Sequence, residues 1–295
     1  MMFMHKGEFI LMKQAFYFYA NPYQPRSLEA AHALHGNLKA RGAVVYAPSW
    51  LAQQGVGIAM EEDALSPDIR AIVALGGDGT LLRAIPLSVQ YSIPLMGVHT
   101  GTVGFLMPGN AAKPEETAAL LLAEEYPTRK RSMLDIRWED QHYLALNDVS
   151  ITRGEHPGVV EVSVLADHEL VFRAHGDGAA ISTPLGATAY AMAAGGPIVR
   201  PDTPCLLAVP ICARELLLRP VVLPLDAKII LTAHGHERRR LQLALDGQLL
   251  FPIQKETRVE VCTAPEQALL ISPGPHTFFN TLRQKQQLWN QQEQE

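Results

Sequence analysis

The first part of the chain alternates short apolar runs with segments of helical periodicity. The run 71–75 contains no polar position, which is typical of a strand that is covered on both faces of a sheet. Apolar residues recur every three or four positions over 28–38 and predict a helix that Ser27 caps and Gly42 ends. Strands are also expected at 15–19, 44–46 and 95–98, and a helix is expected to open at Pro114. Strands that alternate with helices predict a Rossmann-like α/β domain with a parallel sheet.

The pattern changes near residue 128, and from there strands follow strands. Several runs alternate apolar with polar residues, which indicates a sheet with one face in water. The expected strands are 134–138, 142–146, 159–165, 170–172, 228–233, 241–245 and 258–262. The tail from Phe278 to Trp289 is expected to form a short amphipathic helix. The second part is therefore predicted to be a mostly antiparallel all-β domain.

These patterns divide the chain into four expected parts. They are an N-terminal extension at 1–14, an α/β domain at 15–127, a β-rich domain at 128–270 and a C-terminal segment at 271–295.

Composition and charge exclude several classes of protein. The 295 residues are 47% hydrophobic, and 25 Lys+Arg against 30 Asp+Glu give a net charge of −5. A mildly acidic chain has no general electrostatic attraction to nucleic acid or to an anionic membrane. No apolar run approaches the roughly 18–20 residues that a membrane-spanning helix needs. The 3 cysteines form no CxxC pair, so we expect neither disulfides nor structural zinc, and a cytoplasmic location.

The segment Gly76-Gly77-Asp78-Gly79-Thr80 follows the predicted strand 71–75 directly and precedes a helical stretch at 81–84. Its three glycines are expected to adopt positive φ and let backbone N–H groups approach a phosphate, which the end of the helix also attracts. It is neither a Walker loop, which needs Gly-Lys-Ser/Thr, nor a Rossmann fingerprint, because Leu82 stands at the last glycine position. A carboxylate in a phosphate cradle fits either Mg²⁺ binding or acceptance of a proton from an attacking hydroxyl. The alternative is a glycine-rich turn whose Asp78 caps the helix.

Two further clusters carry polar groups without a complete motif. Residues 175–178 and 183–197 combine small residues, hydroxyls and Tyr190, which fits either a ligand-binding surface or a packing interface of small residues. Asn147-Asp148 follows an apolar run and offers an amide and a carboxylate that suit hydrogen bonds to a ribose, although such a pair is usually a turn.

In this order, the motifs resemble the NAD kinase family. The family pattern has a GGDGT loop followed by Gly97, Gly101 and Gly104-Phe105-Leu106, then Asn147-Asp148, Thr183–Pro197, Arg219-Pro220 and Asp246-Gly247-Gln248. The GGDGT loop alone is shared with diacylglycerol, sphingosine and phosphofructo-kinases, whereas the ordered set is highly specific. The resemblance covers roughly residues 15–290.

The resemblance implies transfer of a phosphoryl group from ATP, or from polyphosphate, to the 2′-hydroxyl of the adenosine ribose of NAD. Asp78 matches the family's general base, and the C-terminal segment is expected to pack on the first domain. The positions that match NAD contacts are Gly79, Phe105, Asn147, Asp148, Asp177, Thr188, Ala189, Tyr190 and Gln248. Further residues expected to bind nucleotide are Gly76, Gly77, Thr80, Arg83 and Ala193.

The implied cofactor is Mg²⁺ or another divalent cation, with no metal ligand assigned. The implied partners are small-molecule nucleotides, without nucleic acid or membrane, and the chain is expected to form a homodimer or homotetramer.

The chain also departs from the family pattern. The departures are His99 for Asn, Asp148 for Glu, Leu185 for Thr, Ala187 for Ser, Ala213-Arg214 for Pro-His, and Pro86 for a basic residue. Each lost buried donor is expected to weaken ligand binding by ~1–3 kcal/mol. His99 fits either a ligand contact or a hydrogen bond within its loop. The departures leave open an alternative, a catalytically weak NAD(P)-binding regulatory homologue; a lipid kinase that shares only the GGDGT loop is less favoured.

Overall fold

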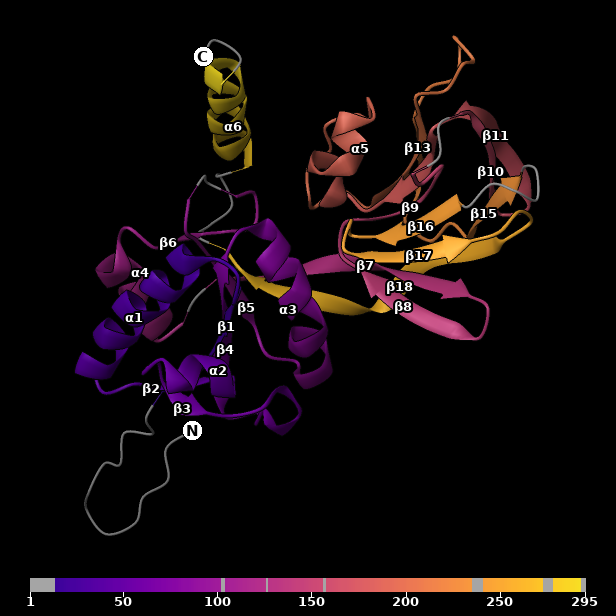
Figure 1. Cartoon of the computed structure of the whole chain (residues 1–295). Coiled ribbons are helices and arrows are strands. Elements are labelled where there is room, and N and C mark those ends of the chain that lie inside the picture. Colours follow the sequence, from indigo (N-terminus) through magenta and orange to yellow (C-terminus); the bar gives the residue numbers. More distant parts are fainter. Residues whose placement is uncertain are drawn as a thin grey trace. The chain divides into compact units, whose positions relative to one another are not determined.

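The computed structural model describes residues 14–101, 104–125, 127–155, 158–234, 241–272 and 278–292. The chain divides into two compact units, which are described separately (Figure 1). Unit 1 contains the residues up to Thr128 and those from Leu270 onward, and unit 2 contains Arg129–Leu269. No helix in the described ranges is long and apolar enough to cross a membrane.

Unit 1 is built on a parallel sheet with strand order β3-β2-β1-β4-β5. Leu270, near the end of a strand that comes from unit 2, pairs with Leu95 beside this sheet. The strands are β1 Ala15–Ala20, β2 Val44–Ala47, β3 Ile58–Ala59, β4 Ile69–Gly76, β5 Leu95–His99 and β6 Gly109–Asn110. The helices are α1 Pro25–Ala40, α2 Ser49–Gln53, α3 Asp78–Tyr91, α4 Pro114–Leu122, α6 Phe278–Gln292 and the 3-10 turn η1 Glu62–Ala64. The expected parallel α/β architecture is confirmed.

Both faces of this sheet are covered, which explains the apolar run in β4. Phe16 and Val73 belong to the buried cluster shared with α1 and α4, whereas α3 contacts β4 and β5 from the other side (Figure 1). Side chains alternate between the two faces of a strand, so a strand in this position needs apolar residues at every step.

The beginning of α1 differs from the prediction. The helix starts at Pro25, and Ser27 lies inside it, fully buried, with its hydroxyl donating to Gln24 Oε1 at 3.4 Å. Proline suits the first turn because its missing N–H has no helical acceptor there. The predicted Ser27 cap is therefore wrong, whereas Gly42, at φ +82°, follows the end of the helix as expected.

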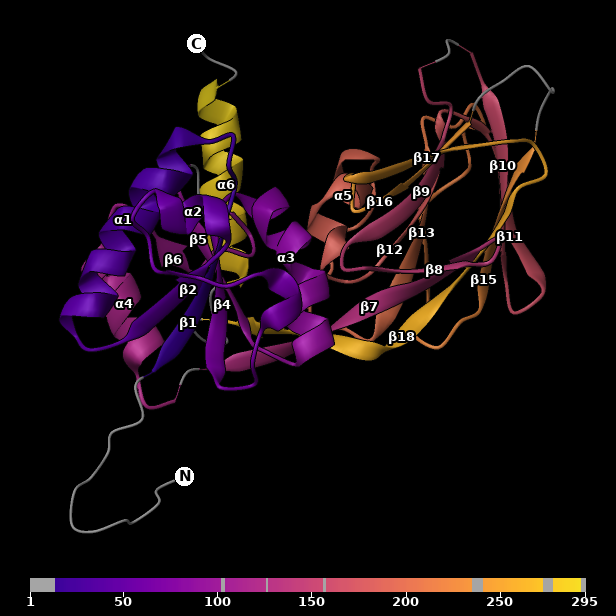
Figure 2. The same cartoon turned by 60° about the horizontal axis from the view of Figure 1, so that its bottom comes forward.

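Unit 2 contains two antiparallel arrays of strands (Figure 2). One has the order β14-β13-β12-β9-β16-β17, and the other has the order β11-β10-β15-β18, with the β7–β8 hairpin joined to β18. The strands are β7 Thr128–Trp138, β8 Gln141–Ala145, β9 Asp148–Thr152, β10 Val160–Ala166, β11 Glu169–Gly176, β12 Gly178–Ser182, β13 Cys205–Ile211, β14 Val221–Pro224, β15 Ile229–His234, β16 Leu241–Leu245, β17 Leu249–Ile253 and β18 Arg258–Ile271. Short helical turns are η2 Gly186–Thr188 and α5 Tyr190–Ala193. The mostly antiparallel β architecture is confirmed.

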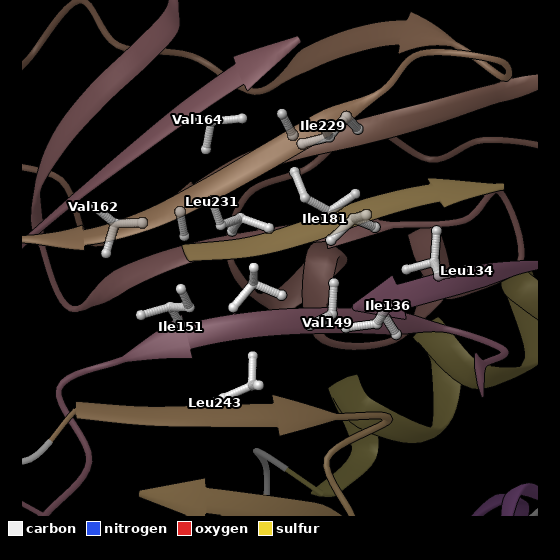
Figure 3. Packing of buried hydrophobic residues seen from close by; sticks show 14 of the residues in the cluster. Leu134, Ile136, Val149, Ile151, Val162, Val164, Ile181, Ile229, Leu231 and Leu243 are labelled. Carbon is white, nitrogen blue, oxygen red and sulfur yellow. The ribbon is translucent and has the colours of Figure 1, made fainter. Parts of the chain in front are cut away.

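The core of unit 2 lies between the two arrays. Figure 3 shows side chains of both arrays turned toward one another. The labelled residues are Leu134, Ile136, Val149, Ile151, Val162, Val164, Ile181, Ile229, Leu231 and Leu243. Burying one such side chain contributes about 1.5–3 kcal/mol. In β15 every second residue is buried, which is the alternation that predicted a strand with one wet face.

Candidate functional site

The GGDGT loop connects β4 to α3 in unit 1. β4 ends at Gly76, Gly77 occupies the N-cap position, and Asp78 is the first residue of α3. A Cβ at Gly76 would collide with the side chain of Thr80, whereas a Cβ at Gly77 would meet no described atom within 4 Å. The loop is thus packed tightly on one side and open in front of Gly77. An open backbone at the start of a 14-residue helix suits an anion.

Two details of the predicted loop are wrong. Gly77 has φ −116°, and Gly79 lies in the first turn of α3, so the loop does not hold three glycines at positive φ. The helix also begins at Asp78 instead of Leu81. The early start is possible because Gly77 takes the extended backbone that an N-cap requires.

The Asp78 carboxylate is fixed by the segment 104–106. Its Oδ2 accepts a hydrogen bond from the Phe105 N–H at 3.2 Å, and its Oδ1 accepts one from the Leu106 N–H at 3.3 Å. A Cβ at Gly104 would collide with Oδ1, so a glycine is needed for this approach. The side chain is 32% exposed. Asp78 is the first residue of α3, and the N-cap position is occupied by Gly77. The alternative of a helix-capping aspartate is therefore not what the structure shows.

The C-terminal helix α6 also reaches this carboxylate. Lys285 Nζ lies 3.6 Å from Asp78 Oδ2 and 4.3 Å from the centre of the Phe105 ring. The Lys285 side chain is only 16% exposed. Sequence reasoning missed this residue, because a lysine in a polar stretch carries no signal of its eventual neighbour.

The other residues predicted near the loop have differing surroundings. Thr80 is buried, with its side chain against Gly76, whereas Arg83 is exposed on α3. His99 at the end of β5 is within hydrogen-bonding distance of the Gly101 carbonyl, with Nδ1 at 2.9 Å. Of the two alternatives for His99, the structure contains the hydrogen bond within the loop.

In unit 2, the Asn147-Asp148 pair lies at the junction of β8 and β9. The carboxylate of Asp246 accepts hydrogen bonds from three consecutive backbone N–H groups, those of Leu146, Asn147 and Asp148, at 2.9, 2.7 and 3.1 Å. The Asp246 N–H in turn donates to the Asp148 carbonyl at 2.9 Å. Asp246 was part of the Asp-Gly-Gln motif but was not among the predicted site residues. Its carboxylate fixes the backbone that carries both polar side chains.

The beginning of the 183–197 segment closes around the same junction. The Thr183 hydroxyl donates to the Leu146 carbonyl at 2.7 Å and accepts from the Gly186 N–H at 3.1 Å. The Thr183 N–H donates to the Asn147 carbonyl at 2.9 Å, and a Cβ at Gly186 would collide with that carbonyl oxygen. Motifs that are far apart in the sequence are thus joined by hydrogen bonds in unit 2.

Two buried carboxylates share this junction. Burial, followed by the nearby charge of Asp246, raises the pKa of Asp148 from 3.8 to about 7, and the backbone N–H of Tyr190 partly offsets this rise. Burial also raises the pKa of Asp246, and the hydrogen bonds that it accepts from three backbone N–H groups partly offset this rise. Both carboxyl groups therefore hold protons more tightly than an exposed aspartate does.

Asp177 and Tyr190 are two further predicted site residues of unit 2 that carry polar groups. Asp177 lies between β11 and β12, is 42% exposed and accepts from Arg153 Nε at 2.9 Å. Burial raises the pKa of the Tyr190 hydroxyl, with further contributions from Asp177, Cys212 and Asp148. Asp148 and Asp177 are thus each close enough to Tyr190 for their charges to act on its hydroxyl.

The remaining predicted residues border this region of unit 2. The Thr188 hydroxyl donates to the Leu185 carbonyl at 3.1 Å, so it already has an internal acceptor. Ala189 precedes α5, the exposed Ala193 ends it, and Gln248 lies in the turn after β16, its N–H donating to the Leu245 carbonyl at 3.0 Å.

The Ala187 departure has a structural explanation. Ala187 is fully buried and belongs to an apolar cluster with Ala191, Leu207 and Val209. A serine at this position would place its hydroxyl next to that apolar cluster. The expected loss of ligand affinity at position 187 stays a prediction.

The chain thus has a parallel α/β unit with a fixed carboxylate in a glycine-rich loop, and an antiparallel β unit with a hydrogen-bonded Asn-Asp junction. These are the features that the sequence predicts for a nucleotide-dependent kinase. The model of the ATP-NAD kinase N-terminal domain matches residues 58–126, and that of the ATP-NAD kinase C-terminal domain matches residues 146–272. The NAD kinase of Heliobacterium modesticaldum is 36% identical over 260 residues, 81% of this chain and 90% of that relative. This chain belongs to the NAD kinase family.

Two solved structures share the fold. The yeast NADH kinase complexed with NADH has a TM-score of 0.78 at 24% identity and covers 92% of this chain and 86% of its own. The Archaeoglobus fulgidus NAD kinase in complex with ATP has a TM-score of 0.71 at 22% identity and covers 93% of this chain and 98% of its own.

Proposed function

We propose that this chain transfers the γ-phosphoryl group of ATP to the 2′-hydroxyl of the adenosine ribose of NAD and so forms NADP and ADP. The carrying observation is the Asp78 carboxylate, fixed by two backbone N–H groups at the start of α3. In this reaction the hydroxyl oxygen bonds to the γ-phosphorus, the bond to the β-phosphate oxygen breaks, and the hydroxyl loses its proton. Asp78 is the acceptor for that proton.

In this proposal, the GGDGT loop around Asp78 binds the phosphates of the donor. Phosphoryl transfer has a loose transition state, so positioning and charge stabilisation contribute more than deprotonation does. The open backbone at Gly77 and the positive end of the α3 dipole attract the phosphate oxygens. Gly76, Gly79, Thr80 and Arg83 contribute to this binding in our proposal.

For the acceptor NAD, the proposal places the contacts in unit 2 and at Phe105. Asn147, Asp148 and Asp177 offer one amide and two carboxyl groups for hydroxyl and amide hydrogen bonds. The ring of Tyr190, which is 41% exposed, offers a surface for stacking. The remaining proposed contacts are Thr188, Ala189, Ala193 and Gln248.

The donor is ATP, with polyphosphate as an alternative donor to be tested. The solved relatives carry NADH and ATP, which supports a nucleotide acceptor and a nucleotide donor. No three His, Cys, Asp or Glu side chains gather as a metal site within the described ranges. Mg²⁺ usually binds through substrate phosphates and one or two carboxylates, and Asp78 fits that requirement. When bound, Mg²⁺ neutralises part of the phosphate charge.

Two finer points complete the proposal. We infer a reducing compartment such as the cytoplasm, which is supported by Cys205, Cys212 and Cys262 all being free thiols. We also propose a homodimer or homotetramer, which analytical ultracentrifugation of the full chain tests.

Replacing Asp78 by Asn tests the assigned base. Asn keeps the shape of the side chain but accepts no proton, so kcat for NADP formation should fall by about 10²–10⁴-fold. The matched control is Asp63→Asn, which removes an equivalent charge from an exposed position in η1 and should leave kcat unchanged. Full activity of the Asp78→Asn enzyme would remove Asp78 from the mechanism.

A further inference from the structure

Lys285 brings a positive charge from the end of the chain to the GGDGT loop. Its ammonium lies 3.6 Å from Asp78 Oδ2 and 4.3 Å from the centre of the Phe105 ring. Asp78 is also held by the N–H groups of Phe105 and Leu106. The ammonium, the carboxylate and the aromatic ring therefore form one cluster within unit 1, with contributions from α6, α3 and the segment 104–106.

This cluster addresses an electrostatic problem of the loop. A carboxylate repels the polyanionic phosphates that the loop must admit, and the repulsion is stronger where water is partly excluded. A Walker loop has its own lysine for the phosphates, but the GGDGT sequence has none. Lys285 occupies the position in which an ammonium offsets the charge of Asp78.

The surroundings of Lys285 favour an electrostatic role in addition to packing α6 within unit 1. Leu282, three residues earlier and therefore on the same face of the helix, is 6% exposed and provides an apolar anchor. The Lys285 side chain is 16% exposed, although lysine is almost never buried without a partner. Its aliphatic part lies in the protein while its charge is directed at Asp78 and the Phe105 ring.

We propose that Lys285 is a positioning residue for phosphoryl transfer, which offsets the charge of Asp78 and allows the phosphates of the donor to approach the loop. This inference rests on the proposed function. It assigns to α6 a part in donor binding, while NAD contacts in unit 2 do not depend on it.

Three variants separate this role from a structural one. Lys285→Met keeps the aliphatic chain and removes the charge, so the KM for ATP should rise about tenfold or more, equivalent to about 1.4 kcal/mol. The KM for NAD should change much less, because all of the proposed NAD contacts except Phe105 belong to unit 2. Lys285→Arg keeps the charge and should recover most of the ATP affinity. The control Arg283→Met removes a charge from an exposed position on the same helix and should behave as the wild type.

Binding of ATP by calorimetry provides a readout that does not require turnover. Lys285→Met should weaken ATP binding in the wild-type background, but much less in an Asp78→Asn background, where there is no charge left to offset. Equal weakening in both backgrounds, or an unchanged KM for ATP in Lys285→Met, would overturn the inference. If the wild type binds ATP but forms no NADP, the proposed function fails, whereas the binding comparison still decides the role of Lys285.

Discussion

Asp78, Asp148 and Asp246 show how the surroundings of a carboxylate decide its behaviour. Asp78 is partly exposed and held by two backbone N–H groups and an ammonium. Asp148 belongs to the short stretch of backbone whose N–H groups donate to Asp246, and burial raises the pKa of both carboxyl groups. The first arrangement leaves the carboxylate accessible to a ligand, and the burial in the second favours a bound proton on Asp148 and Asp246.

At this scale we expect the stability of the protein to depend on pH through Asp148. Its pKa is about 7 in the folded protein against an ordinary value of 3.8. Because the folded state binds the proton more tightly, the stabilising contribution is fully present below the ordinary pKa and is lost as the pH rises through the folded pKa. Relative to Asp148→Asn, the wild type should lose on the order of 2–4 kcal/mol of unfolding free energy between about pH 4 and pH 8.

Urea unfolding of both proteins over this pH range measures that difference, and the subtraction removes the contribution of groups that titrate alike in both. A difference that is independent of pH, or that favours the wild type as the pH rises, would contradict the assigned pKa of Asp148.

At the scale of the elements, the site depends on junctions where backbones pack without room for a side chain. The turn η2 lies against the β8–β9 junction, and Gly186 allows the contact with the Asn147 carbonyl. In unit 1, Gly104 has the same function for the Asp78 carboxylate. Each of these glycines thus allows close contact between two sequence motifs. Gly186 packs against Asn147, and Gly104 packs against Asp78.

The Gly186→Ala variant should therefore be destabilised by about 3 kcal/mol or more, since the added Cβ must displace backbone. The matched control is Gly36→Ala within α1, where a Cβ meets no described atom within 4 Å. That change should stabilise the protein by about 0.5–1 kcal/mol, because alanine favours a helix. Thermal unfolding of both variants measures the two effects, and a Gly186→Ala protein as stable as the wild type would show that the junction is not tightly packed.

The strand β13 was not predicted from the sequence, and Pro210 within it explains why. β13 contains Pro210, and proline is usually absent from central strands because it lacks an N–H. Only residues Cys205–Ala208 of β13 pair with β14, so Pro210 lies beyond that pairing and needs hydrogen bonds on one side alone. β15 was predictable from the sequence, because its residues alternate between buried and partly exposed positions and a strand has this period of two.

At the scale of the whole molecule, the fold class followed from the order of patterns along the chain, and the family followed from the order of motifs. The comparisons support both. The contact of Lys285 with Asp78 could not be predicted, because it depends on where α6 packs in unit 1. Asp246 was visible as a motif, but its role as acceptor of three N–H groups required the strand pairing of β9 with β16.

The most direct test of the account is whether purified protein with NAD, ATP and Mg²⁺ forms NADP. We expect stoichiometric formation of NADP and ADP, with the new phosphate on the 2′-oxygen by ³¹P and ¹H NMR, and the loss of this reaction in Asp78→Asn. Tight binding of NAD or NADP without any phosphoryl transfer from ATP or polyphosphate would contradict the central claim and indicate a regulatory nucleotide-binding protein instead.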